Sequence, residues 1–283
     1  MKKTRRYKTK LRYKRILLFL VMLLMGISAL TFLYFKGSSL SPGKENVSYI
    51  LAVGTDPETD SRADAILLTV INQTKQEASF ISIPSNTAVS SYDKSKGQQL
   101  LGDVYRDGGS EALKSSVENL LHIRINKYAV FTPEDFIYFV DKADGIRLYV
   151  EENMQHTDAE GNLDIDIRQG VQDLDGNAAF SYFRFLDPQN GELGRIQRQE
   201  RLLKDLMSVL QEHSSFMNWA LVKYYWRAYE TDLTATEAAD FMYHLTNIPA
   251  AQLKYEILPG EKNKMENREI WTINPVEMQD LLV

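Results

Sequence analysis

The feature that most constrains this chain is an uninterrupted apolar run near its start. Residues 16–35, ILLFLVMLLMGISALTFLYF, contain no charged side chain, and about 20 apolar residues are what a helix needs to cross the hydrocarbon core of a bilayer. Residues 1–15 hold nine Lys or Arg and no acid. Because such positive flanks stay in the cytoplasm, the sequence predicts a single-pass cell-membrane protein. Its stub (1–15) is expected to be cytoplasmic, its anchor to span 16–35, and its body to be extracellular.

A cleaved signal peptide is the alternative interpretation of this run. The apolar region of a signal peptide is usually only about 7–15 residues long and is followed by a small-residue cleavage site. Here Gly26, Ser28 and Ala29 lie inside the run, and aromatic residues close it. This arrangement favours a retained anchor.

The charge of the remaining chain limits its partners and its chemistry. Beyond position 15 there are 24 basic and 38 acidic residues, and an acidic body is not typical of a nucleic-acid binder. The chain has no cysteine. Disulfides, thiolate metal sites and cysteine nucleophiles are therefore excluded.

Periodicity predicts an α/β domain after a Gly/Ser/Pro-containing linker at 36–46. Apolar runs indicate strands at 47–54, 64–72, 77–84, 127–131, 146–150 and 253–258. Helical spacing indicates helices at 111–122, 132–141, 176–185, 194–213, 216–229, 236–245 and 275–282. This alternation predicts one domain over 47–283, with a central mixed β-sheet flanked by helices on both faces.

The usual catalytic motifs are missing, so chemistry would have to come from carboxylates and guanidinium groups. The sequence has no G-x-S-x-G, P-loop, H-E-x-x-H or G-x-G-x-x-G, and its four histidines are scattered. Asp56 ends the first expected strand, and Arg62 and Asp64 begin the second. Two such carboxylates can hold Mg²⁺ together with waters and phosphate oxygens. The alternative is a polar turn whose acids are simply solvated.

A second group of basic residues lies between two expected helices. Arg184 ends one helix, and Arg195, Arg198 and Gln199 lie within one turn of each other at the start of the next. Cations there oppose the helix dipole, whereas the free N–H groups of a helix start favour phosphate. The group therefore indicates a bound anion, unless it is a solvated face paired with acids such as Glu192.

Seven segments, taken in order, resemble the LytR-CpsA-Psr (LCP) family of membrane-anchored cell-wall glycopolymer phosphotransferases. The resemblance covers roughly residues 50–210. The segments are ILAVGTD (50–56), RADAILLTVIN (62–72), SFISIPSNT (79–87), INKYAVF (125–131), FVDKADGIRLYV (139–150), LDGNAAFSYFR (174–184) and GRIQRQERLL (194–203).

The resemblance implies a transferase that moves glycopolymers, such as teichoic acid or capsular polysaccharide, from a polyprenyl-pyrophosphate carrier onto peptidoglycan with the aid of Mg²⁺. On the family's pattern, Asp56 and Asp64 would be the metal-associated acids. The positions matching pyrophosphate-binding residues are Arg62, Arg184, Arg195 and Gln199, with Arg198 beside them. Arg184 and Arg195 would also be the catalytic residues.

Two departures from that pattern suggest a second function. The family usually reads S-I-P-R-D, and in this chain Ser85-Asn86 replaces the final R-D. The family also reads R-x-R, and here Leu186 replaces the second arginine. The loss of one donor to a reacting phosphate costs about 10²–10³ in rate. The alternative is therefore a degenerate, non-catalytic member that binds polyprenyl-linked glycan or wall polymer. A transcription regulator is disfavoured, because only the stub at 1–15 is expected in the cytoplasm.

Overall fold

The computed structural model describes residues 47–56, 60–90, 97–158, 161, 163–187, 190–265 and 268–281. These residues belong to one compact unit. The predicted stub, anchor and linker lie outside the described residues and stay predictions. Within the described part of the chain, no helix combines the length and the apolar character needed to span a bilayer.

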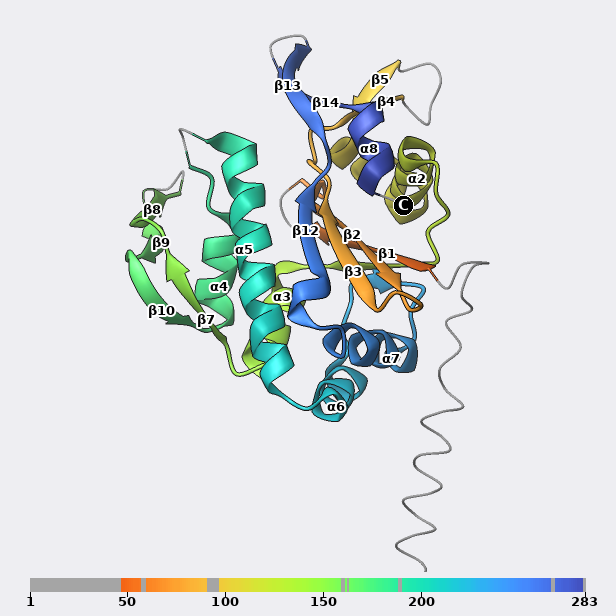
Figure 1. Cartoon of the computed structure of the whole chain (residues 1–283). Helices are drawn as coiled ribbons and strands as arrows, with labels where there is room; N and C mark the ends of the chain where they lie inside the picture. The colour runs from red at the N-terminus through yellow and green to blue at the C-terminus, as the bar shows by residue number, and fades with distance from the viewer. Residues whose placement is uncertain are drawn as a thin grey trace, which may run out of the picture. The chain divides into compact units, whose positions relative to one another are not determined.

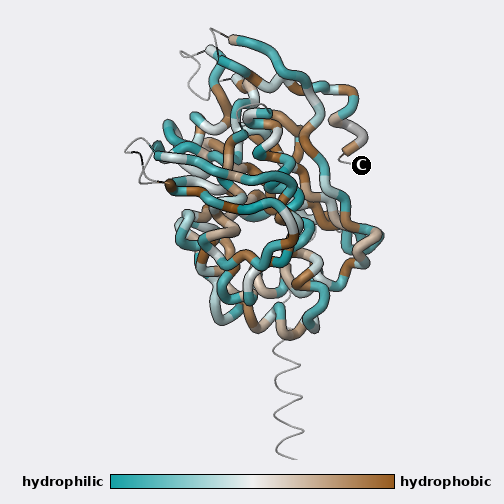
Figure 2. The backbone as a smooth tube through the Cα atoms, turned by 90° about the vertical axis from the view of Figure 1, so that its left-hand side faces the viewer, coloured by the Kyte–Doolittle hydropathy of each residue, from teal (hydrophilic) through white to brown (hydrophobic). Residues whose placement is uncertain are grey.

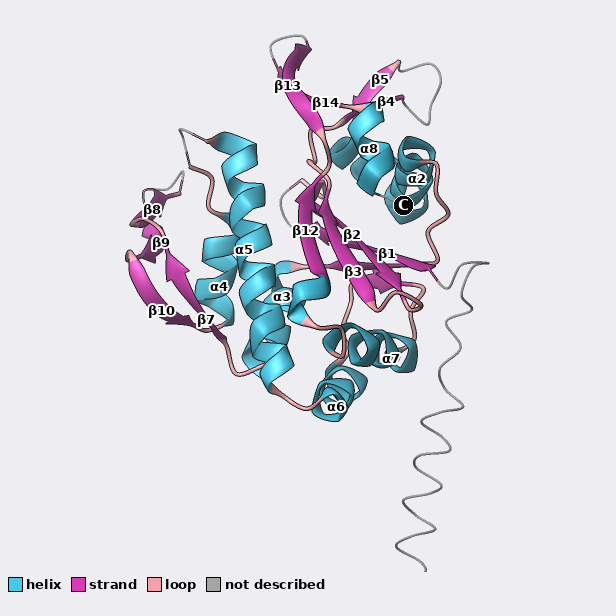
Figure 3. Ribbon diagram, viewed as in Figure 1, coloured by secondary structure: helices cyan, strands magenta, loops and turns pink. Residues whose placement is uncertain are grey.

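The described residues alternate between strands and helices, as Figure 3 shows. The strands are β1 (Val47–Thr55), β2 (Ala63–Asn72), β3 (Glu77–Ser82), β4 (Ala88–Ser90), β5 (Gln98–Leu100), β6 (Lys127–Phe131), β7 (Ile146–Val150), β8 (Met154–Thr157), β9 (Leu163–Ile167), β10 (Gly170–Leu174), β11 (Glu230–Thr231), β12 (Leu253–Ile257), β13 (Gly260–Met265) and β14 (Arg268–Ile273). The helices are α2 (Leu101–Leu121), α3 (Pro133–Lys142), α4 (Gly176–Arg184), α5 (Gly191–Glu212), α6 (Ser215–Tyr225), α7 (Ala235–Thr246), α8 (Pro275–Leu281) and the 3₁₀ turn η1 (Ala250–Gln252).

Six strands form a mixed central sheet in the order β11-β6-β1-β2-β3-β12. The β1–β2, β2–β3 and β6–β11 pairs are antiparallel, whereas β1–β6 and β3–β12 are parallel. Parallel pairs need long crossovers, and helices supply them. The predicted mixed sheet is confirmed.

Helices cover both faces of this sheet (Figure 1). On one face, Leu51 of β1 and Leu68 of β2 join a buried cluster that includes Leu113 of α2. On the other face, Phe80 of β3 belongs to a cluster that includes Leu206 of α5. Successive residues of each strand point to opposite faces. Figure 2 shows apolar and polar residues interleaved along the backbone.

The sequence predicts that this helix begins at residue 111, but α2 begins at Leu101. Its first part, LGDVYRDGG, is rich in Gly and Asp, and Gly109 (φ 73°, ψ −170°) interrupts the helical conformation between the two parts. Only the second part therefore has an uninterrupted apolar spacing. The error matters, because the missed turns carry charged residues of the candidate site.

The other differences concern short polar strands. The predicted strand at 146–150 exists but pairs with β10 in a separate two-stranded sheet. The β4–β5, β8–β9 and β13–β14 ladders were not predicted. Exposed strands of this kind lack the alternation that marks a half-buried strand; most of β13, for example, is exposed. The helix expected at 216–229 ends at Tyr225, and β11 follows.

Gly102 sets how closely α2 approaches the sheet. A Cβ at this position would lie 2.8 Å from the carbonyl oxygen of Ala63 and 3.2 Å from that of Ser85. We predict that Gly102→Ala lowers the free energy of unfolding by about 1–3 kcal/mol, the usual cost of overpacking, as measured by urea denaturation. Gly54→Ala is the matched control, because its Cβ would lie 3.2 Å from the Ala65 Cβ and no closer than 3.9 Å to the Ala65 backbone. An equal loss in both variants would contradict this account.

Candidate functional site

The ends of β1 and β2 bring the first group of predicted site residues to one edge of the sheet. Thr55, the last residue of β1, pairs with Ala63, the first residue of β2. Asp56 follows directly, whereas Arg62 precedes β2 and Asp64 is its second residue. The antiparallel register thus gathers these three charged residues at the same strand ends, as the sequence indicated.

The start of α2 adds an acid that the sequence analysis missed. The Oδ1 atom of Asp103 lies 3.0 Å from Nε of Arg62 and 3.1 Å from Nη1 of Arg106. Asp103 is buried, and the Gly102 amide donates to the carbonyl of Ser85 at 2.8 Å. Because α2 was expected to begin later, its first turn was not recognised as part of the site.

Arg195 joins α5 to this edge of the sheet. Its Nη2 donates to the carbonyl oxygen of Asp64 at 3.1 Å and lies 2.7 Å from Oε2 of Glu192. The Ser85 hydroxyl donates to the other carboxylate oxygen of Glu192 at 3.1 Å. We call Arg62, Asp64, Ser85, Glu192 and Arg195 the Arg195 cluster. The pairing with Glu192 matches the simpler interpretation of the helix start, but an Arg195 side chain only 15% exposed is not on a solvated face.

The Arg195 cluster perturbs the carboxyl group of Asp64. The residue keeps accessible surface, yet protein atoms crowd its carboxylate, and this desolvation raises its pKa above the ordinary 3.8. The positive charges of Arg195 and then Arg62 oppose the rise, whereas Glu192 and Asp60 add to it. Ionised Asp64 is therefore held at a net cost in the folded protein.

The structure places Arg184 beside the β8–β9 hairpin. Its Nη2 lies 2.8 Å from Oδ2 of Asp164, whose other oxygen is 2.6 Å from Nδ1 of His156. The hydrogen bond from His156 and the one from Arg184 lower the pKa of Asp164. Leu186, two residues after Arg184, is 54% exposed. It is therefore not a core residue, and its position can carry a charge.

Arg198 and Gln199 lie further along α5, and Arg198 has a structural role. Its side chain is buried, its Nη2 donates to the carbonyl oxygen of Phe185 at 2.8 Å, and its guanidinium lies 5.1 Å from the Phe185 ring centroid. It thus holds the α4–α5 connection against α5. Gln199 is half-buried on the same helix. The predicted contact of both residues with pyrophosphate stays a prediction.

The donor groups at the strand ends suit a hard cation. Asp56 and Asp64 offer carboxylate oxygens, the ligands that Mg²⁺ prefers, and Asp60 and Glu192 add negative charge at Asp64. Desolvation is the main cause of the raised Asp64 pKa, and a nearby cation would favour the ionised carboxylate. No group of three or more His, Asp or Glu residues with metal-site spacing occurs among the described residues, so any ion would also need ligands from water or substrate.

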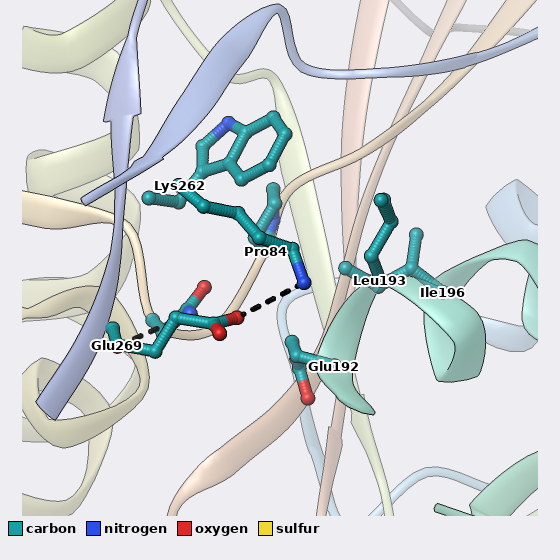
Figure 4. A pocket seen from close by; sticks show the side chains of 8 residues that line it. Pro84, Glu192, Leu193, Ile196, Lys262 and Glu269 are labelled. Carbon is teal, nitrogen blue, oxygen red and sulfur yellow. Dashed lines mark hydrogen bonds and ion pairs between the residues drawn. The ribbon is translucent and has the colours of Figure 1, made fainter. Parts of the chain in front are cut away.

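A small pocket adjoins the Arg195 cluster on the side of the β13–β14 hairpin (Figure 4). Its lining combines apolar and charged side chains: Pro84, Asn86, Glu192, Leu193, Ile196, Lys262, Glu269 and Trp271. Figure 4 shows the Lys262 ammonium directed between Glu269 and the start of α5, and its Nζ lies 3.4 Å from Oε1 of Glu269. The sequence analysis did not identify Lys262, Glu269 and Trp271 as lining residues, because the polar β13–β14 hairpin that carries them was not predicted.

The raised pKa of Asp64 predicts how the free energy of unfolding depends on pH. The Asp64 carboxyl group binds its proton more tightly in the folded protein than in the unfolded chain. The free energy of unfolding therefore falls as pH rises from about 3.8, the ordinary pKa, through the raised pKa of the folded state. We predict that Asp64→Asn is more stable than wild type at pH 7 and that this gain shrinks near pH 4, measured by urea denaturation. Asp173→Asn, at an exposed position, is the control. A gain independent of pH would contradict the assignment.

The role of Arg198 predicts a loss of stability without a loss of ligand contact. We expect Arg198→Met to lower the free energy of unfolding by about 1–3 kcal/mol, because the buried Phe185 carbonyl loses its donor. Thermal and urea unfolding would measure this loss. Pyrophosphate affinity, followed by calorimetry, should change less than in Arg195→Gln. The opposite order of affinities would place Arg198 in the binding site.

Comparison with known proteins places this geometry in a family. The family model described as LytR_cpsA_psr matches residues 35–282. The Enterococcus faecalis protein named polyisoprenyl-teichoic acid–peptidoglycan teichoic acid transferase TagU is 27% identical over 191 residues, which cover 65% of this chain and 60% of that protein. The chain thus spans less than two thirds of this curated relative, and only 39% of an uncharacterized Staphylococcus aureus relative that is 30% identical over 167 residues.

The fold is also that of solved relatives. The crystal structure of Bacillus subtilis TagV matches with a TM-score of 0.72 at 19% identity, covering 85% of this chain and 96% of TagV. Since the family model covers most of the chain, the chain belongs to the LytR-CpsA-Psr family.

Proposed function

We propose that this chain is an extracytoplasmic phosphotransferase that moves a glycopolymer from a polyprenyl-pyrophosphate carrier onto peptidoglycan. The observation that carries the proposal is the Arg195 cluster, in which a mostly buried guanidinium is fixed between Glu192 and the start of β2. The name of the related TagU, a teichoic acid transferase acting on peptidoglycan, supports this class of substrate. The proposal also includes an anchor at 16–35 that keeps the domain at the outer surface of the membrane.

In this reaction the Arg195 cluster would stabilise negative charge on the phosphate oxygens. An acceptor hydroxyl would attack the phosphorus attached to the sugar and lose its proton to water. The bond from this phosphorus to the bridging oxygen would break, and polyprenyl phosphate would leave with that oxygen. Charge on the phosphate oxygens grows during this step, and positioned guanidinium groups stabilise it. Arg62 and Arg195 are oriented by Asp103 and Glu192 respectively, so little reorganisation is required.

Mg²⁺ is part of the same proposal. Asp56 and Asp64 would hold the ion at the strand ends, and the bound ion would neutralise charge on the pyrophosphate. Arg184, near the α4–α5 connection, would complete the positive surface after exchanging Asp164 for a phosphate oxygen. This exchange is plausible because its side chain is 38% exposed.

The two departures from the family pattern have different surroundings. Ser85 is buried and engaged with Glu192, so an arginine there would have to displace packed neighbours. Leu186 is exposed. Of the two restored arginines, Leu186→Arg is therefore the variant that is expected to fold normally and to add a phosphate contact.

The proposal predicts a transfer activity that depends on Arg195. Purified full-length chain, given a lipid-pyrophosphate glycan, a peptidoglycan fragment and Mg²⁺, should release polyprenyl phosphate and form the glycan–peptidoglycan product. Arg195→Gln should lower this rate by about 10²–10³, the usual cost of one donor. Arg147→Gln is the matched control, because Arg147 is exposed and pairs with Asp173 on the β7–β10 sheet.

The outcomes separate the two candidate functions. If wild type binds the lipid donor but releases no polyprenyl phosphate under any of these conditions, the phosphotransferase proposal fails and the non-catalytic binder replaces it. Turnover gained only in Leu186→Arg would lead to the same conclusion for the natural chain. If neither binding nor turnover occurs, both functions fail.

A further inference from the structure

The outer face of α6 is apolar, which is unusual for a helix at the surface of a domain. Phe216, Met217 and Tyr224 are 63%, 59% and 78% exposed, and their spacing places them on one side of the helix. The opposite side carries the buried Asn218 and Val222. Surface helices normally turn polar residues outward. We call Phe216, Met217 and Tyr224 the α6 outer face.

Aromatic and cationic side chains continue this surface beyond α6. Tyr225 is 41% exposed, and its ring lies 6.3 Å from that of Tyr138. The ammonium of Lys142 is 5.2 Å from the Tyr225 ring centroid. The guanidinium of Arg227 is 4.8 Å from the Tyr138 ring centroid, and its Nε pairs with Asp135 at 3.2 Å.

This composition fits the interface of a lipid bilayer better than bulk water. Tyrosines with an apolar body and a polar tip are enriched at the level of the headgroups, and a helix with exposed Phe and Met can bury that face among them. Lys142 and Arg227, together with Lys223 of α6, add positive charge that anionic headgroups attract. The acid that pairs with Arg227 reduces this charge but does not cancel the set.

The length of the chain that precedes β1 permits this contact. The linker at 36–46 can span at most about 40 Å when fully extended, so an anchor at 16–35 would keep β1 near the membrane. Ile50 of β1 belongs to a hydrophobic cluster against which Trp226, the residue that ends α6, also packs. The end of α6 is therefore linked by direct packing to the strand that the linker enters.

We propose that the α6 outer face rests among the headgroups of the membrane to which the chain is anchored. The ligand is an anionic phospholipid surface, and the contact fixes the orientation of the domain. The proposal rests on the predicted anchor and not on the proposed transferase function. It predicts that Phe216 and Tyr224 are in contact with lipid whether or not the chain is active.

The absence of cysteine from the sequence makes a direct test possible. Single variants Phe216→Cys and Tyr224→Cys of the full chain would each carry an environment-sensitive fluorophore and would be reconstituted in vesicles of phosphatidylglycerol and phosphatidylcholine. Val276→Cys is the matched control, since Val276 is 76% exposed on α8, and α8 and α6 lie far apart in Figure 1. Nitroxide-labelled lipids should quench the fluorescence of the probes at 216 and 224 severalfold more than that of the probe at 276. The emission wavelength of the probe at 276 should not shift when vesicles are present.

Further variants test the alternatives. Replacing Phe216 and Met217 with Ser should abolish lipid quenching at 224, with circular dichroism confirming the fold. Equal quenching at all three positions would overturn the proposal. Cross-linking of Tyr224→Cys between copies, with quenching that disappears on dilution of protein in lipid, would instead assign the face to a second copy and overturn it as well. A chain that vesicles do not retain would remove both the anchor and this contact.

Discussion

The pairing of β1 with β2 on one side and β6 on the other determines where Asp56, Arg62 and Asp64 lie. Leu51 and Val53 of β1 are almost fully buried, so the register of the strand is fixed by its alternating side chains. A shift of one residue would turn them to the opposite face of the sheet, away from the cluster that includes α2, and would also move Asp56 relative to Arg62 and Asp64. The site is therefore held in place by the core, although none of its charged members belongs to that core.

The second requirement is that the charges compensate one another without a ligand. Arg62 pairs with Asp103, and Arg195 pairs with Glu192, so each guanidinium already has an acid partner on a helix. These pairs orient the arginines and at the same time limit the positive charge that a phosphate would meet. Asp64 is the exception, because desolvation of its carboxylate outweighs the attraction of the two arginines and raises its pKa. A divalent cation held by Asp56 and Asp64, as proposed above, would favour the ionised form of Asp64.

The sequence predicted the central elements well because burial leaves a periodic pattern. The three strands β1, β2 and β3 and the helix α5 were expected and were found, and the structure brings Arg195 to the backbone of Asp64. What the sequence could not reveal depends on contacts between distant segments. Asp103 was hidden by the Gly-rich start of α2, and the β13–β14 hairpin, with Lys262 and Trp271 beside the cluster, has little hydrophobic alternation. Spacing along a helix also places Arg198 near Arg195, but it does not reveal that Arg198 is buried against Phe185.

The central claim is that the Arg195 cluster binds the pyrophosphate of a lipid carrier. A crystal structure of the chain with a short-chain polyprenyl-pyrophosphate analogue tests it most directly. Mn²⁺ in place of Mg²⁺ would mark the metal by its anomalous signal. The account predicts diphosphate oxygens within hydrogen-bonding distance of the Arg62 and Arg195 guanidinium groups and an anomalous peak beside Asp56 and Asp64. A diphosphate bound away from the cluster, with Arg195 still paired only to Glu192 and the Asp64 carbonyl, would contradict it.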